Sequence, residues 1–351
     1  MNGRTRLDHP WPISGRAGGI SVVIPFFNAA ATLGETIKSV HAQEHINLEV
    51  VVIDDGSTDD SLAVVRSCAP GIRVLTGPNR GVSAARNRGI AATESEWIVF
   101  LDADDLLVPR TLARRLETAE VTSADVVVCN WQELFGHGNR TVDGAVRSAD
   151  LDALRAGIGT GFVADIWVTT AALLYRRSLV ERIGGFREDL PVIQDARFLS
   201  DAAYHGASFA HSPHLGARYR ISPQGLSRRD SARFWRDVLL NGRQIHARWQ
   251  AGGGLTSERM SELADMYNAA AHGLFRAADP AFREAVAALR ASGLPVRRRN
   301  RLAELLSDIA GHRHAARMAG HWTKSRRFLT GMCRERRSSG RPHDRGCGKV
   351  D

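Results

Sequence analysis

Long apolar runs, paired cysteines and a secretion-type leader are all missing from this sequence of 351 residues. No stretch approaches the ~20 apolar residues that a helix needs to cross a bilayer, so a membrane-embedded protein is not expected. Residues 1–18, interpreted as a flexible leader, lack the apolar core of a signal peptide. The four cysteines form no C-x-x-C pair, which argues against a zinc knuckle or a redox dithiol. We therefore expect a cytoplasmic protein, with peripheral contact at the inner face of the membrane left open.

Positive charge is concentrated at one end of the chain. Residues 297–351 hold 15 Lys and Arg against 5 Asp and Glu, whereas residues 1–296 hold 32 and 33. The body is thus nearly neutral, although the whole chain carries a net charge of +9. A basic tail allows three interpretations: a solvated disordered end, contact with an anionic membrane surface, or contact with nucleic acid. Because the tail has few aromatic residues for base stacking, no nucleic-acid partner is expected.

Apolar segments alternate with segments of helical periodicity over residues 19–228. The apolar segments read as continuous runs, which is typical of strands buried on both faces in a mainly parallel sheet. We expect strands at residues 20–24, 50–53, 72–75, 97–101 and 125–129. This alternation predicts an α/β, doubly wound domain followed by a helical region over residues 229–330. Residues 331–351, rich in Arg, Gly and Ser, are expected to form a basic and disordered tail.

Carboxylates gather at the ends of two expected strands. Asp102-Ala103-Asp104-Asp105 follows an apolar run, and three carboxylates this close repel one another unless a positive charge lies nearby. A divalent metal that holds a phosphate-bearing ligand would supply this charge. Asp54-Asp55-Gly56-Ser57 follows another strand, and open α/β sheets bind ligands at the carboxyl edge. Each cluster read alone also fits a plain turn or a solvated helix start.

Two further clusters complete the expected site. Pro25-Phe26-Phe27-Asn28 follows the first strand, where a turn at Pro25 would bracket a base. Asn79-Arg80-Gly81 leads into Ala85-Arg86-Asn87-Arg88-Gly89, and Arg86 would neutralise a phosphate or pair with a base-binding Asp. A carboxylate at a strand end would accept the imide N–H of uracil or a ribose hydroxyl. Together the clusters predict a site for a nucleoside diphosphate with Mn²⁺ or Mg²⁺.

These four strings, in this order and spacing, resemble family 2 of the inverting nucleotide-sugar glycosyltransferases, which have the GT-A fold. The resemblance covers about residues 20–225. It implies a D-x-D motif in which Asp102 and Asp104 hold the metal, with Asp104 as the direct ligand. It also implies a nucleotide-binding set made up of Pro25, Phe27, Asn28, Asp54, Asp55, Arg86 and Asp102.

The same resemblance implies an acceptor side and a catalytic base. Gly185 and Phe186 match the acceptor-side loop of the family, and Trp167 matches a position near where acceptors bind in the family, with a place in the core as the alternative. Gln194-Asp195 stands where the family usually has Glu-Asp, which makes Asp195 the expected base. Gln194 departs from the pattern. If the usual Glu only orients the base, Gln would still hydrogen-bond; if it were essential, activity would be in doubt.

The expected function is therefore metal-dependent, inverting transfer of a sugar from a nucleotide sugar, with UDP favoured, to a glycan or lipid-linked glycan acceptor. No Gln-x-x-Arg-Trp string of processive synthases occurs, which favours transfer of a single sugar. Two alternatives stay open: a catalytically impaired homologue that binds nucleotide, and a sugar-nucleotide nucleotidyltransferase. The second lacks support, since no Gly-rich loop with Lys or Arg follows the first strand.

Overall fold

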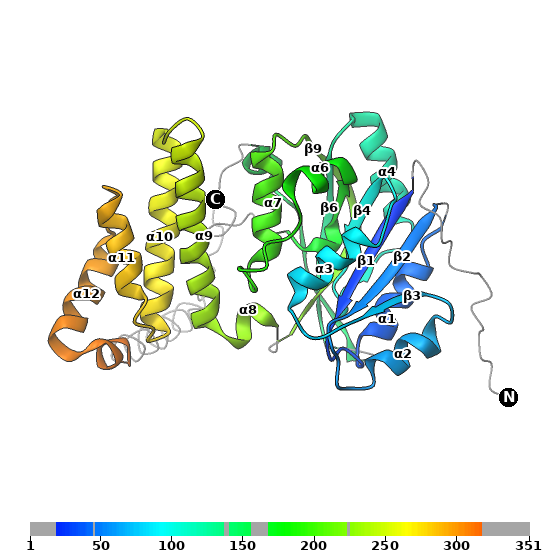
Figure 1. The fold of residues 1–351 in the computed structure, drawn as a ribbon, viewed down its shortest axis with the longest axis horizontal. Coiled ribbons are helices and arrows are strands. Elements are labelled where there is room, and N and C mark those ends of the chain that lie inside the picture. Colours follow the sequence, from blue (N-terminus) through cyan, green and yellow to red (C-terminus); the bar gives the residue numbers. More distant parts are fainter. Residues whose placement is uncertain (1–18, 45, 137–139, 156–167, 223–224, 318–351) are drawn as a thin grey trace, which may run out of the picture.

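A computed structural model describes residues 19–317, apart from 45, 137–139, 156–167 and 223–224 (Figure 1). Its first half is built on one mixed sheet in the order β3-β2-β1-β4-β8-β6-β9-β5, with β7 paired to β6. The first four strands in this order pair in parallel. They are β1 (Ile20–Phe26), β2 (Leu48–Asp54), β3 (Arg73–Thr76) and β4 (Trp97–Phe100). The remaining strands are β5 (Leu106–Leu107), β6 (Val126–Phe135), β7 (Val142–Arg147), β8 (Leu173–Arg176) and β9 (Phe209–Ile221).

Helices lie between the strands in the chain and surround this sheet. They are α1 (Leu33–His41), α2 (Ser61–Cys68), α3 (Val82–Ala91), α4 (Thr111–Thr122), α5 (Leu151–Arg155), α6 (Arg177–Ile183) and α7 (Gln194–Tyr204). The short α8 (Leu226–Arg229) follows β9 and packs against α9 (Ser231–Ala251). α3 packs directly against β1, since a Cβ atom added to Gly89 would lie 2.3 Å from Val23 Cγ1. The expected mixed α/β class with a mostly parallel sheet is confirmed, although β8 runs antiparallel to β4 and β6.

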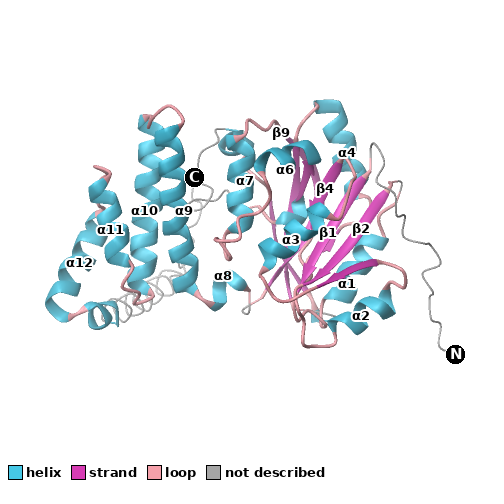
Figure 2. Cartoon of the chain, in the orientation of Figure 1, coloured by secondary structure: helices cyan, strands magenta, loops and turns pink. Residues whose placement is uncertain are grey.

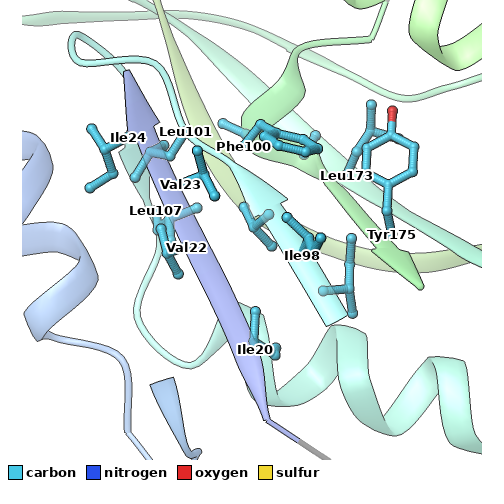
Figure 3. Packing of buried hydrophobic residues seen from close by; sticks show 14 of the residues in the cluster. Ile20, Val22, Val23, Ile24, Ile98, Phe100, Leu101, Leu107, Leu173 and Tyr175 are labelled. Carbon is cyan, nitrogen blue, oxygen red and sulfur yellow. The ribbon is translucent and has the colours of Figure 1, made fainter. Parts of the chain in front are cut away.

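The central strands are buried on both faces, as their continuous apolar sequences predict. Figure 3 shows side chains of β1, β4 and β8 packed together, among them Val23, Phe100 and Tyr175. β1 continues through Pro25, beyond the end that we expected at Ile24. The reason is that pairing with β4 stops at Val23, so the missing N–H of Pro25 faces a side with no neighbouring strand.

The second half of the molecule is helical. Figure 2 shows no strand among α9 (Ser231–Ala251), α10 (Ser257–Arg276), α11 (Phe282–Ala291) and α12 (Arg298–Ala310). These helices enclose their own hydrophobic core, which Leu190 and Ile193 enter from the segment before α7. Within the described ranges, no helix is both long and apolar enough to cross a membrane. The leader, the division between 228 and 229, and the tail stay predictions.

The two halves meet through a buried polar network on α7. Arg197 is 1% exposed and donates to Asp201 (2.9 Å), Asn241 (2.8 Å) and Gln244 (2.7 Å). Arg248 of α9 pairs with the same Asp201 at 2.5 Å. Because every charge in this network has a partner, α7 is held in one orientation against the helical half.

Candidate functional site

The carboxylates of Asp54 and Asp55 both hold backbone turns at the end of β2. Asp54 Oδ1 accepts from the Ser57 N–H at 2.8 Å. Asp55 accepts from the N–H groups of Arg80 (2.9 Å) and Gly81 (2.8 Å), which ties the end of β2 to the start of α3. Both side chains are almost fully buried. Each carboxylate retains free lone pairs, so these bonds leave room for one more donor from a ligand.

The segment after β1 borders the turn at the end of β2. Asn28 has a left-handed φ of 50°, and its Oδ1 accepts from the Thr58 N–H at 2.8 Å. Asn28 therefore joins the loop after β1 to the loop after β2, and α1 begins five residues later. Pro25 is buried, whereas Phe27 is 46% exposed. Of the residues expected to bracket a base, Phe27 offers the open aromatic surface.

The turn at Asp102–Asp105 carries the charge cluster, and the protein supplies part of the counter-charge itself. Arg86 Nη2 donates to Asp102 Oδ1. Asp105 is fully buried and accepts from the Arg220 N–H (2.9 Å) and the Thr169 hydroxyl (3.0 Å). Asp104 has no side-chain hydrogen bond to another described residue. Burial, with repulsion from Asp102, raises the pKa of Asp104 to about 6. Of the three carboxylates, Asp104 is therefore the one whose charge a bound cation would stabilise most.

Arg220 holds the turn at Asp102–Asp105 in place, a role that the sequence did not reveal. It is 4% exposed, and its Nε donates to the backbone oxygen of Asp104 at 2.9 Å. Its Nη2 pairs with Glu35 at 2.7 Å, and Nη1 donates to the carbonyl of Gly136. The sequence signal for it is slight: Arg218-Tyr219-Arg220 resembles the Tyr-Arg segment near the end of family 2 glycosyltransferase domains. Pattern alone could not name its partners, which lie up to 185 residues away.

Arg86 links the turn to α7. Its guanidinium lies over the Phe186 ring at 5.0 Å from the centroid. The side chain is 1% exposed, and neither Nε nor Nη1 has a hydrogen bond within the described ranges. The positive charge of Arg86 lowers the pKa of Asp195, although burial outweighs it and the net pKa is raised. Arg86, Asp102 and Asp195 therefore form one electrostatically coupled group.

Gln194 and Asp195 are the first two residues of α7. The Gln194 side chain folds back, and its Oε1 accepts from the Asp195 N–H at 3.0 Å. Asp195 Oδ1 accepts from the Ala196 N–H at 2.8 Å. The positive end of the helix dipole favours a carboxylate at this position. Gln194 thus contacts the Asp195 backbone, and it does not bring the second negative charge that a Glu would bring.

The residues expected on the acceptor side lie in different surroundings. Phe186 is 4% exposed and stacks on Phe198 with a centroid distance of 4.1 Å, so it belongs to the core beneath Arg86. Gly185 has φ 88°, and Asn87 clamps the loop by accepting from the Phe186 N–H at 2.7 Å. Trp167 lies outside the described residues. The loop is thus tied to α3, which also carries Arg86.

The donor set suits a metal only in combination with a ligand. Across the described ranges, no three His, Cys, Asp or Glu side chains form a group that would hold a metal ion. Asp102 and Asp104 would supply two oxygens, and the oxygens of a diphosphate and water would complete the shell. His312 and His314 lie in the helical half, outside any such arrangement.

Known proteins are similar to the part of the chain that holds the four sequence strings. Residues 21–184 match the family model described as Glycosyl transferase family 2. An uncharacterized glycosyltransferase of Nostoc sp. is 35% identical over 47% of this chain and 52% of its own length. The succinoglycan biosynthesis protein ExoO of Rhizobium meliloti is 30% identical over 62% of this chain and 65% of its own length. The match thus covers between 52% and 65% of these two curated relatives.

Solved structures agree on the fold. TarS of S. aureus aligns with a TM-score of 0.56 and 19% identity over 85% of this chain and 55% of its own. The mannosyltransferase PcManGT from Pyrobaculum calidifontis aligns with a TM-score of 0.53 and 21% identity over 89% of this chain and 88% of its own. At this identity the likeness concerns the fold. With the family match and the four strings, it identifies residues 21–184 as matching glycosyltransferase family 2, on a GT-A-type fold.

Proposed function

We propose that the protein transfers a single sugar from a nucleotide sugar, with UDP as the favoured nucleotide, to a glycan or lipid-linked glycan acceptor with inversion. A divalent metal, Mn²⁺ or Mg²⁺, would assist. TarS has been crystallised with UDP-GlcNAc, and PcManGT with GDP-Man and Mn²⁺, which supports a nucleotide-sugar donor. The name of ExoO, a succinoglycan biosynthesis protein, supports a glycan acceptor.

One observation carries the metal part of this proposal. Asp104 is a largely buried carboxylate with a raised pKa and no side-chain hydrogen bond to another described residue, whereas Asp102 pairs with Arg86 and Asp105 accepts from the Arg220 N–H and the Thr169 hydroxyl. A group in this state gains most from a bound cation. The metal would supply charge stabilisation for the leaving diphosphate. Asp102, held by Arg86, would be the second ligand.

The chain's own residues would perform the rest. Asp195 would take the proton of the acceptor hydroxyl at a carboxylate oxygen, since Oδ1 is engaged by one N–H only. Asp54 and Asp55 would accept from the base or ribose with their remaining lone pairs. Phe27 would stack on the base. Positioning by α3 and α7 would contribute more than any pKa shift.

Calorimetric titration of UDP and GDP, with and without Mn²⁺, tests the donor site. We expect UDP binding that strengthens with Mn²⁺, and we expect Asp104→Ala to abolish the metal dependence because it removes the unmatched carboxylate. Asp60→Ala, which removes an exposed carboxylate of the same domain, serves as the control and should bind as the wild type does. If the folded protein binds neither nucleotide, the proposal is wrong.

Gln194 supports one alternative, a homologue that binds nucleotide without transfer. The position is buried and accepts from the Asp195 N–H, a bond that Glu would also make. In an active enzyme, Gln194→Glu should raise the pKa of Asp195 by adding a negative charge beside it. The acid limb of the kcat profile would then move to higher pH while UDP affinity stays unchanged.

An active enzyme and an impaired homologue would respond differently to Gln194→Glu. Single-turnover sugar transfer and hydrolysis of the nucleotide sugar would be measured for the wild type and Gln194→Glu over the same pH range. A wild type that binds UDP but shows no turnover, together with a Gln194→Glu variant that gains it, would establish the impaired homologue instead.

A further inference from the structure

α12 carries a row of apolar side chains that faces away from the rest of the protein. Leu302, Leu305 and Ile309 are 54%, 55% and 76% exposed and share one face at helical spacing. We call them the α12 stripe. Asn300 and Ala303, on the opposite face, are buried. Figure 1 shows α12 at the end of the molecule farthest from β1 to β3, where nothing described covers it.

The helix is attached to its neighbours by its polar face. Asn300 Nδ2 donates to the Asn268 backbone oxygen of α10 at 2.9 Å. Glu304 pairs with Arg290 at 2.6 Å, and Asp308 pairs with Arg283 at 2.7 Å, both from α11. These contacts fix the orientation of α12, so the stripe cannot turn inward without breaking them.

Charge around the stripe is positive. Both acidic residues of α12 are matched by arginines, as just described. Within the described ranges, no ion pair is formed by Arg298, Arg299, Arg301, Arg313 or Arg317. Arg298 lies one helical turn before Leu302 on the same face, and Arg301 and Arg299 flank it. An exposed apolar row bordered by unmatched arginines is the pattern of a helix that lies at a membrane interface.

We propose that the α12 stripe and its arginines bind the surface of a membrane rich in anionic lipid. A second copy of the chain fits this face poorly. Three side chains are too few for a stable dimer interface, and the unmatched arginines of two copies would repel. Anionic headgroups satisfy both features, since the apolar side chains enter the interface while the arginines meet negative charge. The proposal does not depend on the proposed function.

Vesicle sedimentation of the full chain tests it, with no nucleotide present. The vesicles are phosphatidylcholine alone or mixed with phosphatidylglycerol. We expect binding to the mixed vesicles only, weakening as salt rises. Replacing the stripe by glutamine (Leu302→Gln, Leu305→Gln and Ile309→Gln together) should weaken binding about tenfold or more. Glutamine is a good helix former, and these exposed positions tolerate it without loss of the fold.

A matched pair of single variants separates the stripe from general surface hydrophobicity. Ile309→Gln removes a side chain that is 76% exposed, and Val121→Gln removes one on α4 that is 81% exposed. Only the first should weaken vesicle binding. The basic residues 318–351 are present in every variant. Unchanged binding by the triple variant would therefore assign any lipid contact to them and overturn the proposal.

Two other results would also overturn it. Equal binding to neutral and anionic vesicles would remove the role of the arginines. A change in the sedimentation coefficient of the lipid-free protein between wild type and triple variant would identify a second copy as the occupant. Since neither measurement involves a nucleotide, failure here leaves the donor-site titration unaffected, and failure of that titration leaves this proposal standing.

Discussion

Replacing Asp195 with asparagine should lower kcat by about 10²- to 10⁴-fold, the range that loss of a positioned general base produces. Asn keeps an oxygen that accepts from the Ala196 N–H, so the first turn of α7 should stay intact. Affinity for UDP should change little, because Asp195 faces the acceptor and not the nucleoside in the proposed arrangement. Initial rates of sugar transfer and calorimetric UDP binding together measure both quantities.

A control variant and a pH profile test whether the loss of kcat comes from losing the base. Glu181→Gln removes an exposed carboxylate from the neighbouring helix α6 and should keep wild-type rates. The wild-type rate should fall at acid pH, because Asp195 acts as the unprotonated base. Since burial raises the pKa of Asp195, that fall should occur above the ordinary range of an aspartate. An Asp195→Asn variant with near wild-type kcat would assign the base to another residue.

The sequence located the parts of the site that short strings encode. The sequence predicted the carboxylates Asp54 and Asp102 at strand ends and the segment that carries Arg86. Each depends on a local pattern, and the parallel topology gathers the strand ends at one edge of the sheet. The fold class followed for the same reason. Element boundaries followed less closely, since the strand expected at residues 50–53 spans Leu48–Asp54.

Partner choice over long distance could not be predicted. Arg86 was expected to neutralise a phosphate or to pair with a base-binding Asp, and it pairs with Asp102 of the predicted nucleotide-binding set, but the sequence did not indicate which Asp it would choose. Phe186 was expected to meet the acceptor, yet its ring lies in the core because Phe198 and Phe100 surround it. The very short β5 and the β7 hairpin carry too few residues for a periodic signal. In each case tertiary packing decides, and no local pattern records it.

The polar network on α7 gives the helical half a part in the site. Val192, three residues before Asp195, donates its N–H to Asp237 of α9 at 2.9 Å. Leu190 and Ile193 insert into the core of the helical half. The start of α7, and with it Asp195, is therefore held from the side of α9 as well as from the sheet. Changes in the helical half would reach catalysis through this segment.

Replacing Arg220 with alanine should destabilise the protein by about 3–5 kcal/mol, the usual cost of breaking a buried ion pair from one side. Three hydrogen bonds of the guanidinium would be lost, to Asp104, Gly136 and Glu35. Asp104, whose pKa burial raises, would lose the nearby positive charge of Arg220, which lowers that pKa. The free energy of unfolding, measured by urea titration with circular dichroism, should show this loss.

Arg218 is the matched control, since it lies two residues away on the same strand. Its pair with Asp143 spans 3.2 Å at the surface, with the two side chains 39% and 46% exposed. Such a pair is worth about 1 kcal/mol or less, so Arg218→Ala should cost little. Arg220→Lys should fall between the two alanine variants, because an ammonium keeps the charge but cannot reach three acceptors in a fixed fork. Equal stabilities for Arg220→Ala and Arg218→Ala would show that the turn at Asp102–Asp105 is held by other contacts.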